Sequence, residues 1–162
     1  DRTTCVLFGD GAGAAVFELA ENVPFAITLG ARGSEAIRAG GPAACDTAPI
    51  TMDGKAVFRF AVETMPRCLQ TVLDRSQKTL SDLDWVVCHQ ANARIIDFVA
   101  KRLKAREGLF YKNMERYGNT SAASIPMALD ELVEQGTLKP GMRVLTVGFG
   151  GGLTWAGALF TW

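Results

Sequence analysis

The sequence lacks the residue clusters that build metal sites or disulfide scaffolds. Its 162 residues include one histidine and four cysteines, with no Cys-x-x-Cys pair. Zinc sites are usually assembled from closely spaced cysteines and histidines, so this pattern argues against a zinc centre. The cysteines are Cys5, Cys45, Cys68 and Cys88. Their wide spacing predicts free thiols in a reducing compartment, the cytoplasm.

An excess of one charge and long apolar runs are also missing. Seventeen basic residues balance seventeen acidic ones, which leaves no basic excess to attract nucleic acid. Every apolar run is much shorter than a membrane span, and no basic amphipathic stretch points to a membrane surface. The composition is 48% hydrophobic and 21% charged, which suits a chain that buries a core. We therefore expect a globular domain that binds neither nucleic acid nor membranes.

Strand-like and helix-like segments alternate along the chain. The expected helices span residues 52–76, 92–103 and 121–135. The expected strands span residues 4–8, 14–17, 27–33, 85–88, 144–147 and 153–162. A glycine turn joins the first two strands, and a Gly/Pro/Ala-rich loop spans residues 40–50. This alternation predicts one α/β domain over residues 1–162, with a mixed, mostly buried sheet flanked by helices.

Three loops at predicted strand ends carry sequences suited to chemistry. His89 directly follows an apolar strand, and its imidazole can act as acid, base or hydrogen-bond donor, or can be structural. Asn119 lies in the run 118–126, which also fits a helix start capped by a polar side chain. The glycines of residues 148–155 expose backbone N–H groups to an oxyanion, or form only a hairpin turn.

A dinucleotide-binding module fits the glycines poorly. Neither the cluster at residues 9–13 nor that at 148–152 has the spacing Gly-x-Gly-x-x-Gly. Neither precedes a clear helix followed by an acidic residue about 20 positions on. A nucleotide-binding α/β domain is therefore disfavoured.

The polar loops form a recognisable set when read in order. They are His-Gln-Ala-Asn at residues 89–92, Gly-Asn-Thr-Ser-Ala-Ala-Ser-Ile-Pro at 118–126, and Gly-Phe-Gly-Gly-Gly-Leu-Thr-Trp at 148–155. Together they resemble the β-ketoacyl-acyl carrier protein synthase III enzymes. Residues 7–14 and 52–58 look like the same family, so the resemblance runs the length of the chain.

The resemblance implies a thiolase fold, which consists of two similar α/β halves. This chain resembles only the C-terminal half, and the family's nucleophilic cysteine lies in the other half. The chain also starts at Asp1, just before a strand-like run, so we expect a piece of a longer polypeptide that is inactive alone. Cys88 neighbours His89, but adjacent strand residues point to opposite faces. This geometry argues against Cys88 as the nucleophile.

The family's reaction is a decarboxylative Claisen condensation that initiates fatty-acid synthesis. An acyl group moves from coenzyme A to the cysteine, and malonyl-acyl carrier protein then loses CO₂ and attacks the acyl thioester. The resemblance assigns His89 and Asn119 as catalytic donors to the enolate oxygen. It assigns the backbone N–H of Gly151, rather than Gly150, to the oxyanion hole, and Phe149 to shielding the cysteine.

The resemblance also places four further residues along the substrate tunnel: Asn92, Arg94, Gly54 and Phe58. Arg94 would contact the phosphopantetheine arm or the carrier protein, but it also fits a solvated helix position. Phe58 fits the protein core equally well. These residues are the less specific part of the predicted site.

The implied reactants are a coenzyme A thioester and acyl carrier protein, with no separate cofactor and no metal. The full enzyme is expected to contain the N-terminal half and to form a cytoplasmic homodimer. One alternative is a specialised polyketide- or quinolone-type condensing enzyme of the same superfamily. Another is a non-catalytic condensing-enzyme-like subunit, but such subunits usually lose residues equivalent to His89 and Asn119.

Overall fold

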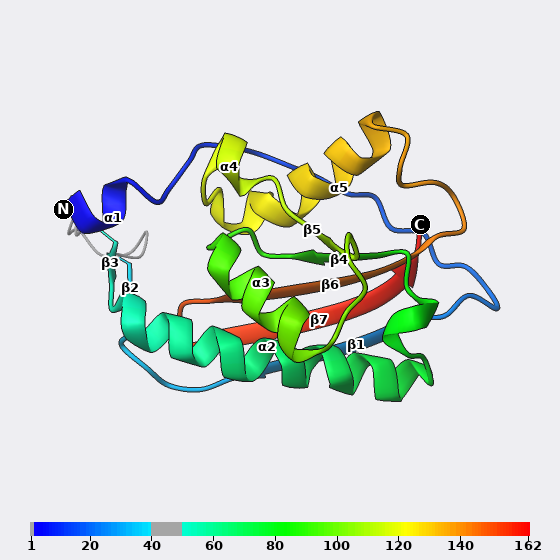
Figure 1. Ribbon diagram of the computed structural model, residues 1–162, viewed down its shortest axis with the longest axis horizontal. Helices are drawn as coiled ribbons and strands as arrows, with labels where there is room; N and C mark the ends of the chain where they lie inside the picture. The colour runs from blue at the N-terminus through cyan, green and yellow to red at the C-terminus, as the bar shows by residue number, and fades with distance from the viewer. Residues whose placement is uncertain (1, 40–49) are drawn as a thin grey trace.

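A five-stranded mixed sheet forms the centre of the molecule (Figure 1). This computed structural model describes residues 2–39 and 50–162. In sheet order the strands are β1 (Ala26–Ala31), β7 (Thr154–Thr161), β6 (Arg143–Gly150), β4 (Trp85–Cys88) and β5 (Phe110–Tyr111). Strands β6, β4 and β5 are parallel, whereas β7 is antiparallel to both β6 and β1. The predicted mixed sheet is confirmed.

Helices cover both faces of this sheet. Helices α2 (Gly54–Ser76) and α3 (Ala93–Arg102) lie on one face, and α5 (Ser124–Glu134) lies on the other (Figure 1). The shorter elements are α1 (Arg2–Cys5), β2 (Ile37–Arg38), β3 (Thr51–Met52), η1 (Leu80–Asp82), α4 (Met114–Tyr117) and η2 (Ser121–Ala123). Among the described residues no helix is both long and apolar enough to cross a bilayer.

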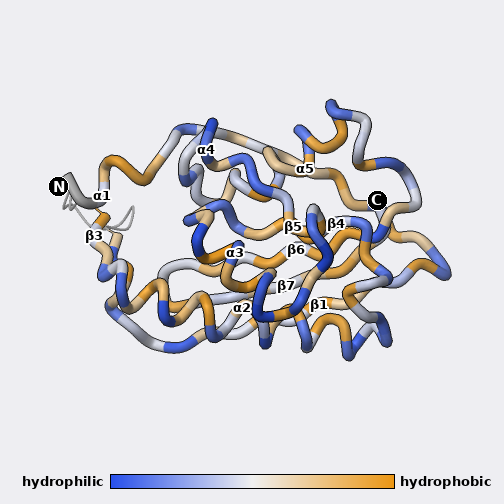
Figure 2. Tube along the Cα trace, in the orientation of Figure 1, coloured by the Kyte–Doolittle hydropathy of each residue, from blue (hydrophilic) through white to orange (hydrophobic). Residues whose placement is uncertain are grey.

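Strand β4 is buried from both sides, as its wholly apolar sequence predicts. Val86 and Cys88 pack into the cluster formed with α2 and α3, and Val87 packs into the cluster formed with α5. All three side chains are fully buried. Figure 2 shows the apolar colouring of the sheet strands between more polar outer segments. Because successive residues alternate between faces, Cys88 points away from the side on which α5 lies.

Helix α2 runs through a proline without ending. Asp53 caps its start, where the carboxylate accepts hydrogen bonds of 3.0 Å from the backbone N–H groups of the second and third residues after it. Pro66 has no N–H, so the carbonyl of Val62 loses its usual helical partner. The guanidinium of Arg102 in α3 donates to that carbonyl at 3.4 Å. The two helices are therefore joined at the position where the proline interrupts the hydrogen-bond ladder.

The predicted N-terminal hairpin is wrong. Residues 2–5 form α1 instead, and residues 9–20 have no regular secondary structure. Phe8 makes one isolated parallel bridge, to Asn119. The segment runs over the surface beside α5 (Figure 1), with Val16 and Leu19 almost fully exposed. A strand needs a neighbour to pair with, and this segment finds no ladder among residues 2–39 and 50–162.

Smaller differences concern element boundaries. Strand β6 continues through Gly150, so the predicted loop 148–152 is reduced to a turn at its end. The predicted helix 121–135 begins as a 3₁₀ turn and becomes α-helical at Ser124. Residues 104–118, where the sequence predicts neither helix nor strand, contain β5 and α4. Most of the predicted loop 40–50 lies outside the described residues, as does Cys45.

Close packing of α2 on β7 depends on one residue without a side chain. A Cβ atom built on Gly157 would lie 2.7 Å from the Cys68 sulfur, 3.2 Å from Val72 Cγ2 and 3.4 Å from the Thr146 carbonyl oxygen. The sulfur and Val72 belong to the face of α2 that forms the main core. Helix and strand can approach this closely only because position 157 is a glycine.

Gly157→Ala is therefore expected to lower the free energy of unfolding by about 1–3 kcal/mol, the usual cost of overpacking a core. Adding Cys68→Ala should restore part of the loss, because it removes the nearest clashing atom. Gly148→Ala on the neighbouring strand is the matched control, since its Cβ would meet nothing closer than 3.7 Å. Urea unfolding of the variants measures the effect. Equal stability of the Gly157→Ala and Gly148→Ala variants would contradict it.

Candidate active site

The polar loop motifs meet at the carboxyl ends of the parallel strands β4 and β6. The backbone N–H of His89, just after β4, donates to the carbonyl of Val147 in β6 at 2.8 Å. A pocket of about 790 Å³ opens at this edge. Four of the predicted site residues line it: His89, Asn119, Phe149 and Gly151. Residues from three separate loops therefore share one cavity.

His89 lies partly buried in the wall of the pocket. Its Nδ1 atom is 2.7 Å from the hydroxyl oxygen of Ser124 at the start of α5. The ring also packs edge-to-face against Phe149, with 5.4 Å between ring centroids. Burial lowers the pKa of His89 from 6.5 to about 4, because the charged form loses hydration. The imidazole is therefore neutral at pH 7.

Asn119 is held by both its backbone and its side chain. The backbone N–H donates to the carbonyl of Leu7, and its carbonyl accepts from the N–H of Gly9, each at 2.9 Å. Its side-chain oxygen accepts a 2.9 Å hydrogen bond from the backbone N–H of Ser121. Because the oxygen is engaged, the amide is oriented with its NH₂ group left to donate. Asn119 is 9% exposed and lines the pocket.

The end of β6 and the following turn form another wall of the pocket. Phe149 is buried, and its ring centroid lies 6.3 Å from that of Phe60 in α2. Gly150 and Gly151 both line the cavity, and a Cβ on Gly151 would lie 3.7 Å from the Ile37 side chain. The wall thus combines a fixed aromatic ring with backbone that carries no side chains.

The other four predicted residues lie outside the pocket lining. Asn92 caps α3, where its side chain accepts from the backbone N–H of Arg94 at 2.9 Å. Arg94 is exposed, and so is Gly54 at the start of α2. Phe58 packs edge-to-face with Phe98 of α3, with ring centroids 6.5 Å apart. Their assignment to a substrate tunnel stays a prediction.

Ser124 is a site residue that the sequence reasoning missed. Its hydroxyl contacts His89, and the side chain is only 3% exposed. In the sequence it stands as one small residue among several in the run 118–126. A helical pattern places a residue on a face but does not indicate which side chain of a neighbouring loop it will meet.

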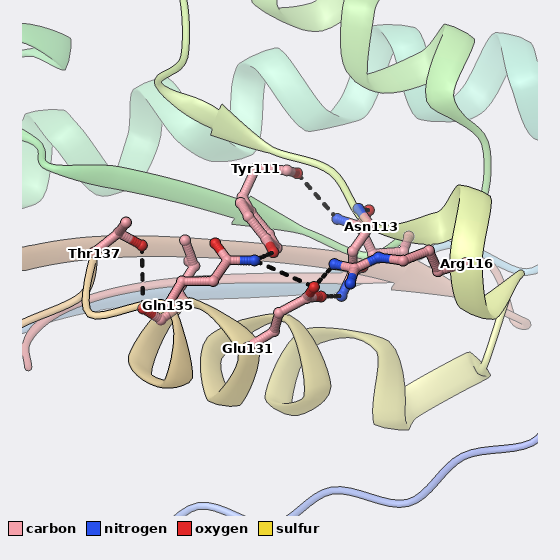
Figure 3. A network of polar contacts seen from close by, with 8 residues as sticks. Tyr111, Asn113, Arg116, Glu131, Gln135 and Thr137 are labelled. Carbon is pink, nitrogen blue, oxygen red and sulfur yellow. Dashed lines mark hydrogen bonds and ion pairs between the residues drawn. The ribbon is translucent and has the colours of Figure 1, made fainter.

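A buried polar network supports this edge of the sheet from behind. The side chain of Gln90 donates to the carbonyls of Cys88 and Tyr111, at 2.8 and 3.2 Å, and accepts from the backbone N–H of Asn113 at 3.1 Å. Figure 3 shows how the network continues beyond Asn113: Glu131 of α5 accepts a hydrogen bond from the Asn113 side chain at 2.7 Å and pairs with Arg116. The loop after β4 is therefore tied to β5, α4 and α5.

The described cysteines are poorly suited to act as nucleophiles. Cys88 is completely buried, and desolvation together with the nearby Cys68 raises the pKa of its thiol. Burial raises the pKa of Cys68 to about 11. Cys5 is exposed, and no described residue that lines the pocket is a cysteine. Within residues 2–39 and 50–162, no group of three metal-binding side chains is assembled.

Comparisons with known proteins match this architecture. A family model described as 3-oxoacyl-[acyl-carrier-protein (ACP)] synthase III C terminal matches residues 73–162. β-Ketoacyl-[acyl-carrier-protein] synthase III of Clostridium novyi is 44% identical over 174 residues, covering 100% of this chain and 54% of that protein. The same enzyme of Thermosynechococcus vestitus is 44% identical over 182 residues, with the same coverage.

Solved structures give the same result. 3-Oxoacyl-[acyl-carrier-protein] synthase III from Aquifex aeolicus superposes with a TM-score of 0.91 at 38% identity, covering 100% of this chain and 52% of that one. The synthase III from Thermus thermophilus gives a TM-score of 0.86 at 38% identity, covering 100% and 54%. These likenesses confirm the predicted family resemblance and its thiolase-like fold. The chain spans about half the length of the curated relatives it matches. On the match over residues 73–162, this chain belongs to the 3-oxoacyl-[acyl-carrier-protein] synthase III C-terminal family.

Proposed function

We propose that this chain supplies the enolate-stabilising half of a β-ketoacyl-acyl carrier protein synthase III. The reaction would be the decarboxylative condensation of an acyl-coenzyme A starter with malonyl-acyl carrier protein. The observation that carries the proposal is the convergence of His89 and Asn119 on one pocket. Nδ1 of His89 and the amide oxygen of Asn119 are already engaged, which leaves Nε2 of His89 and the NH₂ group of Asn119 for a ligand.

The chemistry asks for neutral donors rather than acids. When the malonyl carboxylate leaves as CO₂, the electron pair of the broken bond moves toward the thioester carbonyl, and its oxygen becomes negative. An N–H donor from His89 and one from Asn119 would hold this oxygen without giving up a proton. The depressed pKa of His89 supports the role, since a neutral imidazole does not readily protonate the enolate. One such donor is typically worth about 3 kcal/mol in the transition state.

The acyl thioester needs a nucleophile and an oxyanion hole. We assign residues 1–162 to the C-terminal domain and the nucleophilic cysteine to a preceding half, because the buried thiols of Cys68 and Cys88 are hard to ionise. The backbone N–H of Gly151 would share the hole with that of the cysteine. Phe149 would keep water from the thioester, a role that its buried place in the pocket wall supports.

The reactants follow from the same assignment. Acyl-coenzyme A and acyl carrier protein would be the thioester carriers, with no separate cofactor, in a cytoplasmic homodimer of the full enzyme. Asn92, Arg94, Gly54 and Phe58 would line the approach to the pocket. Arg94 is the candidate contact for the carrier's phosphopantetheine arm, which its exposed position at the start of α3 allows.

Removal of either donor should abolish most of the condensation. In the full-length gene product, His89→Ala and Asn119→Ala are each expected to lower kcat by about 10²–10³, the usual cost of losing one oxyanion donor. The assay is β-ketoacyl formation from acetyl-coenzyme A and malonyl-acyl carrier protein. Lys139→Ala is the control, because this exposed residue lies before the start of β6, whereas the pocket lies at the end of that strand. Full activity in His89→Ala would refute the proposal.

A neutral, buried His89 also makes stability depend on pH. Its pKa is about 4 in the folded chain against 6.5 in the unfolded one, so the unfolded state binds the extra proton between these values. Stability should therefore fall as the pH drops, by about 2 kcal/mol between pH 7 and pH 5 for this group alone. Urea unfolding at the two pH values measures the slope. The His89→Gln variant should lose this part of it, and an identical slope in both proteins would contradict the prediction.

A further inference from the structure

The hydroxyl of Ser124 sits between two groups of the β4 loop. It lies 2.7 Å from Nδ1 of His89 and 3.2 Å from the backbone nitrogen of Gln90. Within residues 2–39 and 50–162 the Ser124 oxygen has no other hydrogen-bond partner. The serine is also buried, so solvent offers no ready substitute. These two contacts therefore decide the direction of both hydrogen bonds.

The direction follows from what each group is able to do. A backbone N–H only donates, so the Ser124 oxygen must accept from Gln90. Ser124 then has one hydrogen to give, and the remaining neighbour is Nδ1 of His89. If Nδ1 carried the proton instead, the buried serine hydrogen would face a second donor and be left without an acceptor. The satisfied arrangement has Ser124 donating to an unprotonated Nδ1.

We propose that Ser124 is a positioning residue that fixes His89 in the tautomer protonated at Nε2. In a neutral imidazole, the nitrogen that accepts a hydrogen bond determines that the other one carries the proton. Nε2 has no partner among the described residues, and His89 lines the pocket. The inference rests on the proposed function in one respect, because the fixed tautomer supplies the N–H that the enolate oxygen would accept.

The serine is itself held from two sides. Gln90 is anchored by its side-chain bonds to β4, β5 and the backbone of Asn113. Glu131 lies two helical turns after Ser124 on α5 and accepts from the side chain of Asn113 (Figure 3). Helix α5 thus carries the Ser124 hydroxyl in its first turn and, two turns later, the Glu131 carboxylate that binds Asn113. This leaves the hydroxyl little freedom to turn away from His89.

The tautomer can be read directly, without substrate. His89 is the only histidine of the chain, so ¹⁵N-histidine labelling gives one pair of ring nitrogens. Long-range ¹H–¹⁵N spectra of the 162-residue chain at pH 7 should show Nε2 protonated and Nδ1 bare. Ser124→Ala should give a mixture of the two tautomers. Ser124→Thr, which keeps the hydroxyl, should restore the single form.

Ser76→Ala is the matched control. It also removes a partly buried helix hydroxyl, which contacts the carbonyls of Val72 and Leu73 at the end of α2, far from the pocket. It should leave the His89 spectrum unchanged. A wild-type ring protonated at Nδ1 would overturn the inference, as would a Ser124→Ala chain that keeps the single Nε2-protonated form. The wild-type spectrum decides even if Ser124→Ala fails to fold.

Activity separates this inference from the proposed function. In the full-length gene product, Ser124→Ala should lower kcat by about two- to fivefold, in step with the loss of the Nε2-protonated tautomer, with little change in KM, and Ser124→Thr should recover it. If the tautomer becomes mixed while condensation is unaffected, Ser124 still positions the ring but His89 is not the enolate donor. If condensation falls while the tautomer stays fixed, the positioning role is refuted and the catalytic role stands.

Discussion

The site depends on the parallel pairing of β4 with β6. Their register places Cys88 opposite Val147, so both strands end at the same edge. The hydrogen bond from the His89 N–H to Val147 extends this ladder by one step, to the first residue of the loop. A one-residue slip would turn every side chain of β4 to the other face and carry His89 away from the glycine turn. The core thus fixes the geometry of the loops.

Burying polar groups at this edge is tolerable because each has a partner. Among the described residues, no buried side-chain nitrogen or oxygen lacks a hydrogen bond. The side chain of Gln90 bonds to the carbonyl of Cys88 and to the backbone N–H of Asn113. The Glu131 carboxylate accepts a hydrogen bond from the Asn113 side chain and pairs with Arg116. A half-satisfied network of this kind would destabilise the fold, whereas a complete one makes it rigid.

Sequence reasoning performed best where local pattern and burial agree. The apolar run of β4 and the helical spacing of α2 and α3 were predicted close to their observed bounds. The meeting of His89 with the glycine turn also follows, because β4 and β6 are parallel neighbours whose carboxyl ends share one edge. Asn119 follows α4 and not a strand, so this rule does not place it. The strand prediction for residues 4–17 was wrong, because strand formation depends on a distant partner that an apolar sequence alone does not reveal. The contact of Ser124 with His89 was missed for a similar reason, since it joins elements 35 residues apart.

The junction between α2 and α3 has an evolutionary consequence. Pro66 leaves the Val62 carbonyl in need of a donor, and Arg102 provides one from another helix. In a relative that replaces the proline, the new residue supplies the missing N–H, so position 102 no longer needs an arginine. A relative that keeps the proline but loses the arginine must find water or another donor for that carbonyl. The two positions, 36 residues apart in the sequence, should therefore change together across relatives.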